Sequence, residues 1–116
     1  MIDQGALKYA GEASWQTRER QGTAQVNCVV QCQNRLALEL AWNNVTYVAW
    51  LDLAEADVYS GIYEVVTLRK LLRGKATCIL KPAEGGVQVR GIFEEQLLDY
   101  VWCGRLVNVT DDKACQ

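Results

Sequence analysis

Apolar and polar residues alternate along most of this chain, which is the period of a β-strand. From position 24 to 33 the even positions are apolar and the odd positions are mostly polar. The next segment places Leu36, Leu38, Leu40 and Trp42 on one face and shorter or polar residues on the other. The spacing of three to four residues that is typical of an amphipathic helix is nearly absent. The pattern therefore predicts an all-β protein whose strands each turn one face to a core.

Asn43-Asn44 divides two of these runs and predicts a two-residue turn, because asparagine tolerates a positive φ angle. A turn there pairs Trp42 with Val45 on the apolar face. On the opposite face it pairs Arg35 with Asp52, which carry opposite charges. Both faces are consistent with the same register, so we expect a hairpin at this point.

The hairpin before it is predicted from a loop at 33–35. A three-residue loop at this position puts Cys28 opposite Leu40 and Cys32 opposite Leu36. Asparagine at the centre of the loop can adopt the left-handed conformation, which favours this type of connection.

Five cysteines are present, and we interpret them as structural rather than chemical. Cys28 and Cys32 are four residues apart, which is ~13 Å along a strand. A disulfide requires Cα atoms within ~7 Å, so these two cysteines share a face but neither a bond nor a metal. Cys78 and Cys103 are expected to be buried in the same way, and Cys115 is expected to be exposed.

Glycines recur inside the strand-like runs, at Gly11, Gly61, Gly74, Gly91 and Gly104. An interior glycine marks a bend, a bulge or a close backbone approach. Glycines repeated in successive strands are a device by which a sheet curls into a barrel. These positions therefore favour a closed or nearly closed β-barrel over an open sheet.

Eight strands joined by short loops are predicted, which is typical of a single antiparallel meander. Closing the sheet removes the exposed edges. In the last strand, either Trp102 and Leu106 or Val101 and Cys103 face inward. The expected strands span residues 7–17, 23–33, 35–43, 45–53, 59–68, 71–80, 86–94 and 98–108.

The bulk composition narrows the function classes. The 116 residues suffice for one domain, which we place at 1–110 with a polar tail at 111–116. The net charge of −2 argues against a nucleic-acid partner. The chain has no histidine, which removes the commonest general base and metal ligand. No signal peptide or apolar membrane span is recognisable, so we expect a cytoplasmic protein without a membrane partner.

Two charged clusters are interpreted as solvated turns. One is the basic run at 69–75, and the other comprises Glu94-Glu95 and Asp99. No nucleophile–base pair, phosphate-binding loop or metal-ligand spacing is recognisable. The sequence therefore predicts no enzyme, no cofactor and no metal.

The early strand reads Gly11-Glu12-Ala13-Ser14-Trp15 in a meander of eight strands, and so resembles the calycin barrels: lipocalins, fatty-acid-binding proteins and avidins. Lipocalins begin with Gly-x-Trp, whereas the spacing here is Gly-x-x-x-Trp. Their last strand carries an arginine near that tryptophan, and Arg105 stands in the corresponding region. The resemblance implies a barrel that holds a small apolar molecule and names no ligand.

Two functions are carried forward from the inward and outward faces. The first is a binding protein that holds a small apolar or aromatic ligand in the barrel, the alternative interior being a plain packed core. The second is a protein-interaction module, most simply a homodimer, formed through the outward face at Ala37, Val48 and Trp50. The residues predicted to line the ligand site are Trp15, Leu38, Leu40, Trp42, Tyr47, Tyr63, Phe93 and Trp102.

Overall fold

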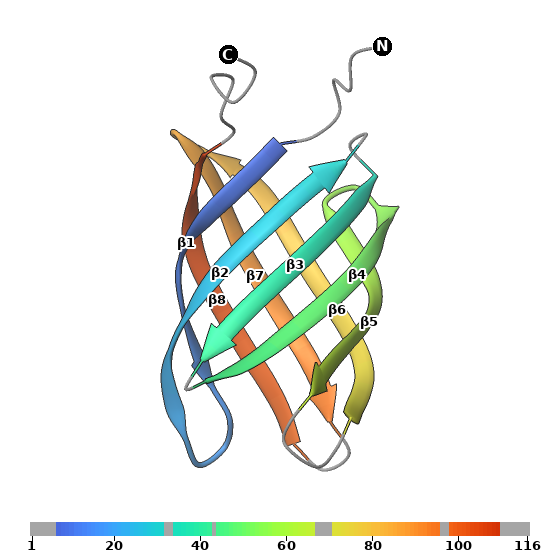
Figure 1. The fold of residues 1–116 in the computed structure, drawn as a ribbon. Helices are drawn as coiled ribbons and strands as arrows, with labels where there is room; N and C mark the ends of the chain where they lie inside the picture. The colour runs from blue at the N-terminus through green and yellow to red at the C-terminus, as the bar shows by residue number, and fades with distance from the viewer. Residues whose placement is uncertain (1–6, 32–33, 43, 67–70, 96–97, 110–116) are drawn as a thin grey trace.

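The computed structural model describes residues 7–31, 34–42, 44–66, 71–95 and 98–109. Its eight strands form a closed barrel in which each strand is antiparallel to the next and β8 pairs with β1 (Figure 1). The predicted all-β meander is confirmed. The strands are β1 (Leu7–Gln16), β2 (Gln21–Gln31), β3 (Arg35–Trp42), β4 (Val45–Glu55), β5 (Val58–Val66), β6 (Leu71–Ala83), β7 (Gly86–Glu95) and β8 (Leu98–Asn108).

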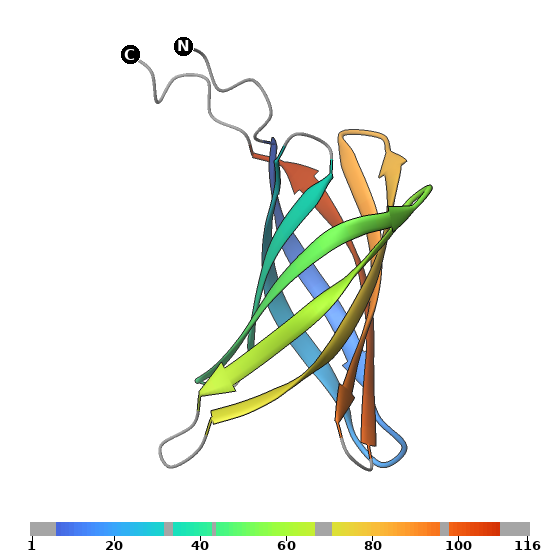
Figure 2. The same cartoon turned by 90° about the vertical axis from the view of Figure 1, so that its right-hand side faces the viewer.

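The strands tilt around the barrel axis, as two perpendicular views show (Figure 1, Figure 2). β1 begins and β8 ends at the same end of the barrel, where Tyr9 pairs with Asn108. At the opposite end β1 connects to β2 and β3 connects to β4. Inward-facing side chains from all eight strands form the core, which occupies the lumen.

Three strands extend beyond their predicted C-terminal ends, β7 by the single residue Glu95. β4 continues to Glu55 and β6 to Ala83. The chain reverses in tight turns that use positive φ angles, 35° at Ala56 and 75° at Gly85, so fewer residues are needed for each connection. The register of β4 with β5 shifts between Leu53 and Glu55, where the extra residue adds a local bulge.

The β3–β4 hairpin has the predicted register. Trp42 pairs with Val45, and Arg35 pairs with Asp52. The Arg35 Nε lies 3.5 Å from the Asp52 carboxylate, so the expected opposite-charge pair is present. Asn44 has a φ angle of 65°, as the turn requires. Asn43 lies outside the described residues.

The predicted register of the β2–β3 hairpin is wrong by two residues. Cys28 pairs with Leu38, and the last pair before the turn is Gln31 with Arg35. The backbone N–H of Asn34 donates to the carbonyl of Gln31 at 3.1 Å, so the turn closes one residue earlier than predicted. A one-residue displacement of a hairpin turn moves the pairing by two residues. The inward and outward faces are therefore the same in both registers.

The prediction for the cysteines is confirmed at two positions and wrong at one. Cys28 and Cys78 are buried in the lumen as free thiols. Cys103 is exposed, because β8 has the phase that places Trp102 inward and its neighbour outward. Cys32 and Cys115 lie outside the described residues.

All five interior glycines occupy positions where a side chain would collide with a neighbouring strand, and two show the closest approach. A Cβ at Gly61 would lie 2.0 Å from the carbonyl oxygen of Trp50 on β4. A Cβ at Gly91 would lie 2.3 Å from the indole ring of Trp102 on β8. The glycines therefore permit close approach, which is one of the three roles expected from the sequence.

Candidate functional site

The half of the lumen beside the β3–β4 turn is filled by aromatic side chains, and we call it the aromatic end. Neighbouring rings have centroids between 4.7 and 6.2 Å apart, so they form one continuous cluster. Six of the eight strands contribute to this cluster. Each can do so because inward positions recur every second residue along a strand. The rings belong to Trp15, Trp42, Tyr47, Tyr63, Phe93, Tyr100 and Trp102.

Phe93 lies at the centre of this cluster. Tyr63 stacks on it at a centroid distance of 4.8 Å and Tyr47 at 5.4 Å, with interplanar angles of 21° and 14°. The Trp102 ring is tilted by 56° at 5.7 Å. Offset stacking and tilted contacts are the favourable geometries for aromatic pairs. The centre of the aromatic end is therefore a well-packed apolar surface.

Trp42 forms the outer edge of the cluster and is half-buried. Its ring meets Trp15 edge to face at 4.7 Å. The guanidinium carbon of Arg20 lies 5.4 Å from the centroid of the Trp42 ring, within the range of a cation–π contact. Trp42 and Tyr100, which is also half-buried, therefore separate the buried rings from solvent.

The indole N–H groups of Trp15 and Trp102 are buried and have no hydrogen-bond acceptor in the described part of the chain. The two residues pair directly across β1 and β8 and are only 6% and 1% exposed. Each indole lies against a glycine of the next strand, Trp15 against Gly22 and Trp102 against Gly91. A buried donor without a partner is rare and costs about 1–3 kcal/mol. Trp15 and Trp102 both line the aromatic end, so this part of the lumen holds two donors without a partner in the described chain.

A polar group lies beside the rings. The Tyr63 hydroxyl donates to the backbone carbonyl of Glu94 at 3.2 Å, and the Glu95 side chain lies within its hydrogen-bonding reach. Burial and then the charge of Glu95 raise the pKa of Tyr63 and of Tyr47, so both hydroxyls stay protonated at neutral pH. Burial also raises the pKa of Glu95 itself. The site thus offers neutral hydroxyl groups and one partly desolvated carboxyl group.

A cavity of about 20 Å³ remains among these side chains. That volume holds roughly one water molecule, so side chains fill this half of the lumen. The sequence left open whether the barrel interior is a cavity or a packed core. At the aromatic end the interior is packed. The cavity is lined by Trp15, Leu40, Trp42, Tyr47, Phe93, Tyr100 and Trp102.

Most of the ligand-site residues predicted from the sequence meet at this cavity. Tyr63 does not line it but stacks on Phe93 beside it. Leu38 is buried elsewhere in the lumen and does not line this cavity. Sequence reasoning missed Tyr100, and it placed Glu95 in a solvated turn. Inward positions recur every second residue, so Glu95 follows Phe93 on the inward side of β7 and Tyr100 precedes Trp102 on that of β8. This period was the available signal for both residues.

The opposite half of the lumen holds two buried thiols, Cys28 and Cys78. Burial raises the pKa of the Cys28 thiol and of the Cys78 thiol to about 12. Both thiols are therefore protonated at neutral pH and behave as small apolar side chains. No group of three potential ligands among histidine, cysteine, aspartate and glutamate lies together in the described ranges.

No protein-family model, no curated protein and no solved structure matches this chain. The assignment of a closed eight-stranded barrel is therefore based on the strand order and register of this chain alone. Arg105 lies on the outer face opposite Glu12, whereas Trp15 faces the lumen and pairs with Trp102. Within residues 7–109, apart from the undescribed gaps, no helix has the length and apolar character needed to cross a bilayer.

The predicted interface residues lie together on the outer face of β3, β4 and β5. Trp50 is 50% exposed and pairs with Ala37 on one side and Ile62 on the other. Ile62, which the sequence prediction did not include, is 46% exposed. Val48 is half-buried two positions before Trp50. We call these four residues the Trp50 face.

Proposed function

We propose that this protein binds a small aromatic or apolar molecule at the aromatic end of the barrel and does not transform it. The observation that carries this proposal is the pair of buried indole N–H groups of Trp15 and Trp102, which lack acceptors in the described chain. A ligand with a carbonyl, ether or hydroxyl oxygen would satisfy a donor that is otherwise left unpaired. The closed antiparallel barrel of eight strands, an architecture that calycins also have, supports the same class of function.

Entry of such a ligand requires the edge of the cluster to move. The cavity holds only about one water molecule, so a ring-sized ligand must displace side chains. Trp42 and Tyr100 are the half-buried rings that line it, whereas Trp102 and Phe93 are fully buried. We therefore assign Trp42 and Tyr100 as the rings that swing outward. Buried Phe93 and Trp102 supply the surface on which the ligand stacks.

The proposal includes no reaction. The tyrosine hydroxyls nearest the cavity have pKa values raised by burial, which opposes their use as bases at neutral pH. The buried thiols are likewise protonated. We retain the cytoplasmic location expected from the sequence as part of this proposal.

Replacing Trp102 by phenylalanine is expected to weaken binding of an aromatic ketone by about tenfold, since one hydrogen bond contributes about 1 kcal/mol or slightly more. The change keeps an aromatic ring and removes only the N–H donor and part of the surface. Binding of 2-acetylnaphthalene and of its hydrocarbon counterpart, 2-ethylnaphthalene, would be measured by calorimetry. Trp15→Phe should act in the same direction.

The hydrocarbon separates the hydrogen bond from lost stacking area. Trp102→Phe should reduce affinity for the ketone much more than affinity for the hydrocarbon. Trp50→Phe, on the outer face, is the matched control and should change neither. Equal losses for both probes would show that the indole donor does not contact the ligand, and absence of binding to the unmodified protein would remove the proposal.

We infer a homodimer through the Trp50 face as a second candidate function. Trp50 and Ile62 are large apolar side chains, half-exposed and directly paired, and Ala37 and Val48 extend the apolar surface beside them. Ala37 on β3 pairs with Trp50. Along β3, Arg35 lies two positions before Ala37 and Glu39 two positions after it. A two-fold axis across the strands would bring the Arg35–Asp52 pair of one copy against Glu39 of the other, so Arg35 would gain a second carboxylate partner in the dimer.

Trp50→Glu is expected to convert such a dimer into a monomer, because a charge would be buried at the centre of the interface. Sedimentation velocity at several protein concentrations would measure the change. Thr23→Glu, an exposed substitution on β2, is the control and should leave the dimer intact. A native protein that remains monomeric at high concentration would exclude this second function.

A further inference from the structure

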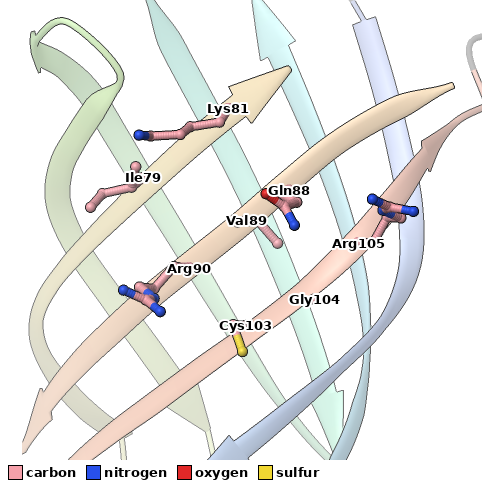
Figure 3. Close-up of a pocket in the computed structure, with 8 residues that line it drawn as sticks. All are labelled: Ile79, Lys81, Gln88, Val89, Arg90, Cys103, Gly104 and Arg105. Carbon is pink, nitrogen blue, oxygen red and sulfur yellow. The ribbon is translucent and has the colours of Figure 1, made fainter. Parts of the chain in front are cut away.

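The outer face of β6, β7 and β8 carries a hollow of about 490 Å³ (Figure 3). This volume lies within the range of small-molecule sites, roughly 300–1,000 Å³. It is separate from the aromatic end, because most of its residues alternate with the inward-facing ones along the same strands. The lining residues are Ile79, Lys81, Gln88, Val89, Arg90, Cys103, Gly104 and Arg105.

The strand register arranges the outward side chains in two adjacent rows. Lys81 pairs with Gln88, which pairs with Arg105. Arg90 occupies the centre of the second row, between Ile79 and Cys103. The floor lies where Gly104, which has no side chain, pairs with Val89. Both are inward-facing positions of their strands, so the backbone at this point forms the floor between the outward cationic side chains.

The hollow has an unbalanced positive charge. Lys81, Arg90 and Arg105 all line it, and the residues that line it include no carboxylate. The nearest acidic residue by register is Glu12, opposite Arg105 on β1. The ion pairs found among the described residues involve other cations. A local cluster of three positive charges on a chain of net charge −2 is a site of opposite sign to the rest of the molecule.

The spacing of the cations suits a molecule that carries more than one anionic group. Lys81 and Arg105 are two strands apart, which is about 10 Å, and Arg90 is displaced by two residues, about 7 Å along the strand. Two guanidinium groups can each bind a phosphate or carboxylate group through paired hydrogen bonds. The Gln88 amide adds a neutral donor between Lys81 and Arg105 (Figure 3).

We propose that this hollow binds a small molecule that carries two anionic groups, phosphate or carboxylate. One anionic group lies between Arg90 and Arg105 and the other near Lys81. The site does not depend on ligand binding at the aromatic end, since it faces the outside of the barrel wall.

Cys103 supplies a reporter inside the hollow. It is exposed, whereas Cys28 and Cys78 are buried. Its thiolate attacks one sulfur of a disulfide reagent, which forms a mixed disulfide and releases the second half as a thiolate. The cations around Cys103 should attract a dianionic aromatic disulfide, 5,5′-dithiobis(2-nitrobenzoate), and so raise the rate of its reaction with this thiol. A neutral disulfide, 4,4′-dithiodipyridine, gives the reference rate.

The test uses the full chain with Cys32→Ser and Cys115→Ser, so that Cys103 is the reporting thiol. Arg90→Glu combined with Arg105→Glu is expected to slow the dianionic reagent by at least about tenfold, the lower range of electrostatic rate effects. The rate with the neutral reagent should change by less than about twofold, because the thiol stays exposed and uncovered. Arg18→Glu combined with Lys75→Glu, at two exposed positions outside the hollow, is the matched control with the same change of net charge and should change neither rate.

Pyrophosphate is the binding probe. It should protect Cys103 from both reagents in the unmodified background and lose this protection in the double variant. Monophosphate should protect less, because it carries a single anionic group. Absence of protection by millimolar pyrophosphate, or equal protection in the Arg90→Glu, Arg105→Glu variant, would overturn the proposal. A similar loss of rate in the Arg18→Glu, Lys75→Glu variant would show a general charge effect and would also overturn it.

Discussion

Trp102→Ala is expected to destabilise the barrel by about 3–5 kcal/mol, which is the usual loss for a buried tryptophan. Trp102 is 1% exposed and pairs across the sheet with Trp15 and Gly91. Its ring contacts that of Phe93 in a tilted arrangement. Its removal leaves a void in the lumen that the closed sheet cannot collapse around. The loss is a large part of the total stability of a small domain, roughly 5–15 kcal/mol. Urea denaturation followed by circular dichroism would measure it.

Trp50→Ala is the matched control, because it removes the same side chain from the outer face. The half-exposed position predicts a change of about 0.5 kcal/mol or less in a monomer. The melting temperature of the Trp102 variant should fall by more than about 10 °C. Equal effects of the two substitutions would mean that the lumen is not packed around Trp102.

Gly61→Val is expected to prevent stable folding or to cost at least about 3 kcal/mol, the upper part of the range for overpacking. A Cβ at this position would lie 2.0 Å from the Trp50 carbonyl oxygen and 2.9 Å from the Leu51 Cα. Both are backbone atoms of the paired strand, so neither can rotate away. Soluble yield and the midpoint of urea denaturation would report the effect.

Gly85→Asn provides the comparison. Gly85 has a φ angle of 75°, and no atom lies within 4 Å of a Cβ placed there. Asparagine tolerates the left-handed region better than other residues with a side chain. We therefore expect a loss of about 1 kcal/mol or less, as for an exposed turn. If Gly61→Val were as stable as Gly85→Asn, the close contact between β4 and β5 would be incorrect.

The β3–β4 hairpin shows how well local signals specify the fold. Two asparagines mark the turn, and the register that follows pairs Arg35 with Asp52 and apolar with apolar. The β2–β3 hairpin lacks such a constraint. Shifting its turn by one residue keeps every inward residue inward, so the burial pattern cannot distinguish Leu38 from Leu40 as the partner of Cys28.

The candidate site could be predicted in its residue types but not in its packing. Alternation identified Trp15, Tyr47 and Phe93 as inward. It could not show that Glu95 reaches Tyr63, because that contact joins strands more than thirty residues apart. It also left the phase of β8 open. Pairing of Trp102 with Trp15 across the closing strands decides that phase, and closure is a property of the whole sheet.

The hollow on β6–β8 was missed for a related reason. Lys81, Arg90 and Arg105 are separated by nine and fifteen positions in the sequence. None forms a charge run, so no local pattern draws attention to them. Only the register across three strands puts them around one space. By contrast, the basic run noted in the sequence lies partly outside the described residues.

Native mass spectrometry of the protein purified from its source under mild conditions tests the central claim most directly. The claim is that the aromatic end holds a small aromatic or apolar molecule with an oxygen acceptor. The native spectrum should show excess mass that disappears on denaturation, and Trp102→Phe should reduce the occupied fraction. A native mass equal to that of the bare chain, together with no binding of 2-acetylnaphthalene in solution, would contradict the account.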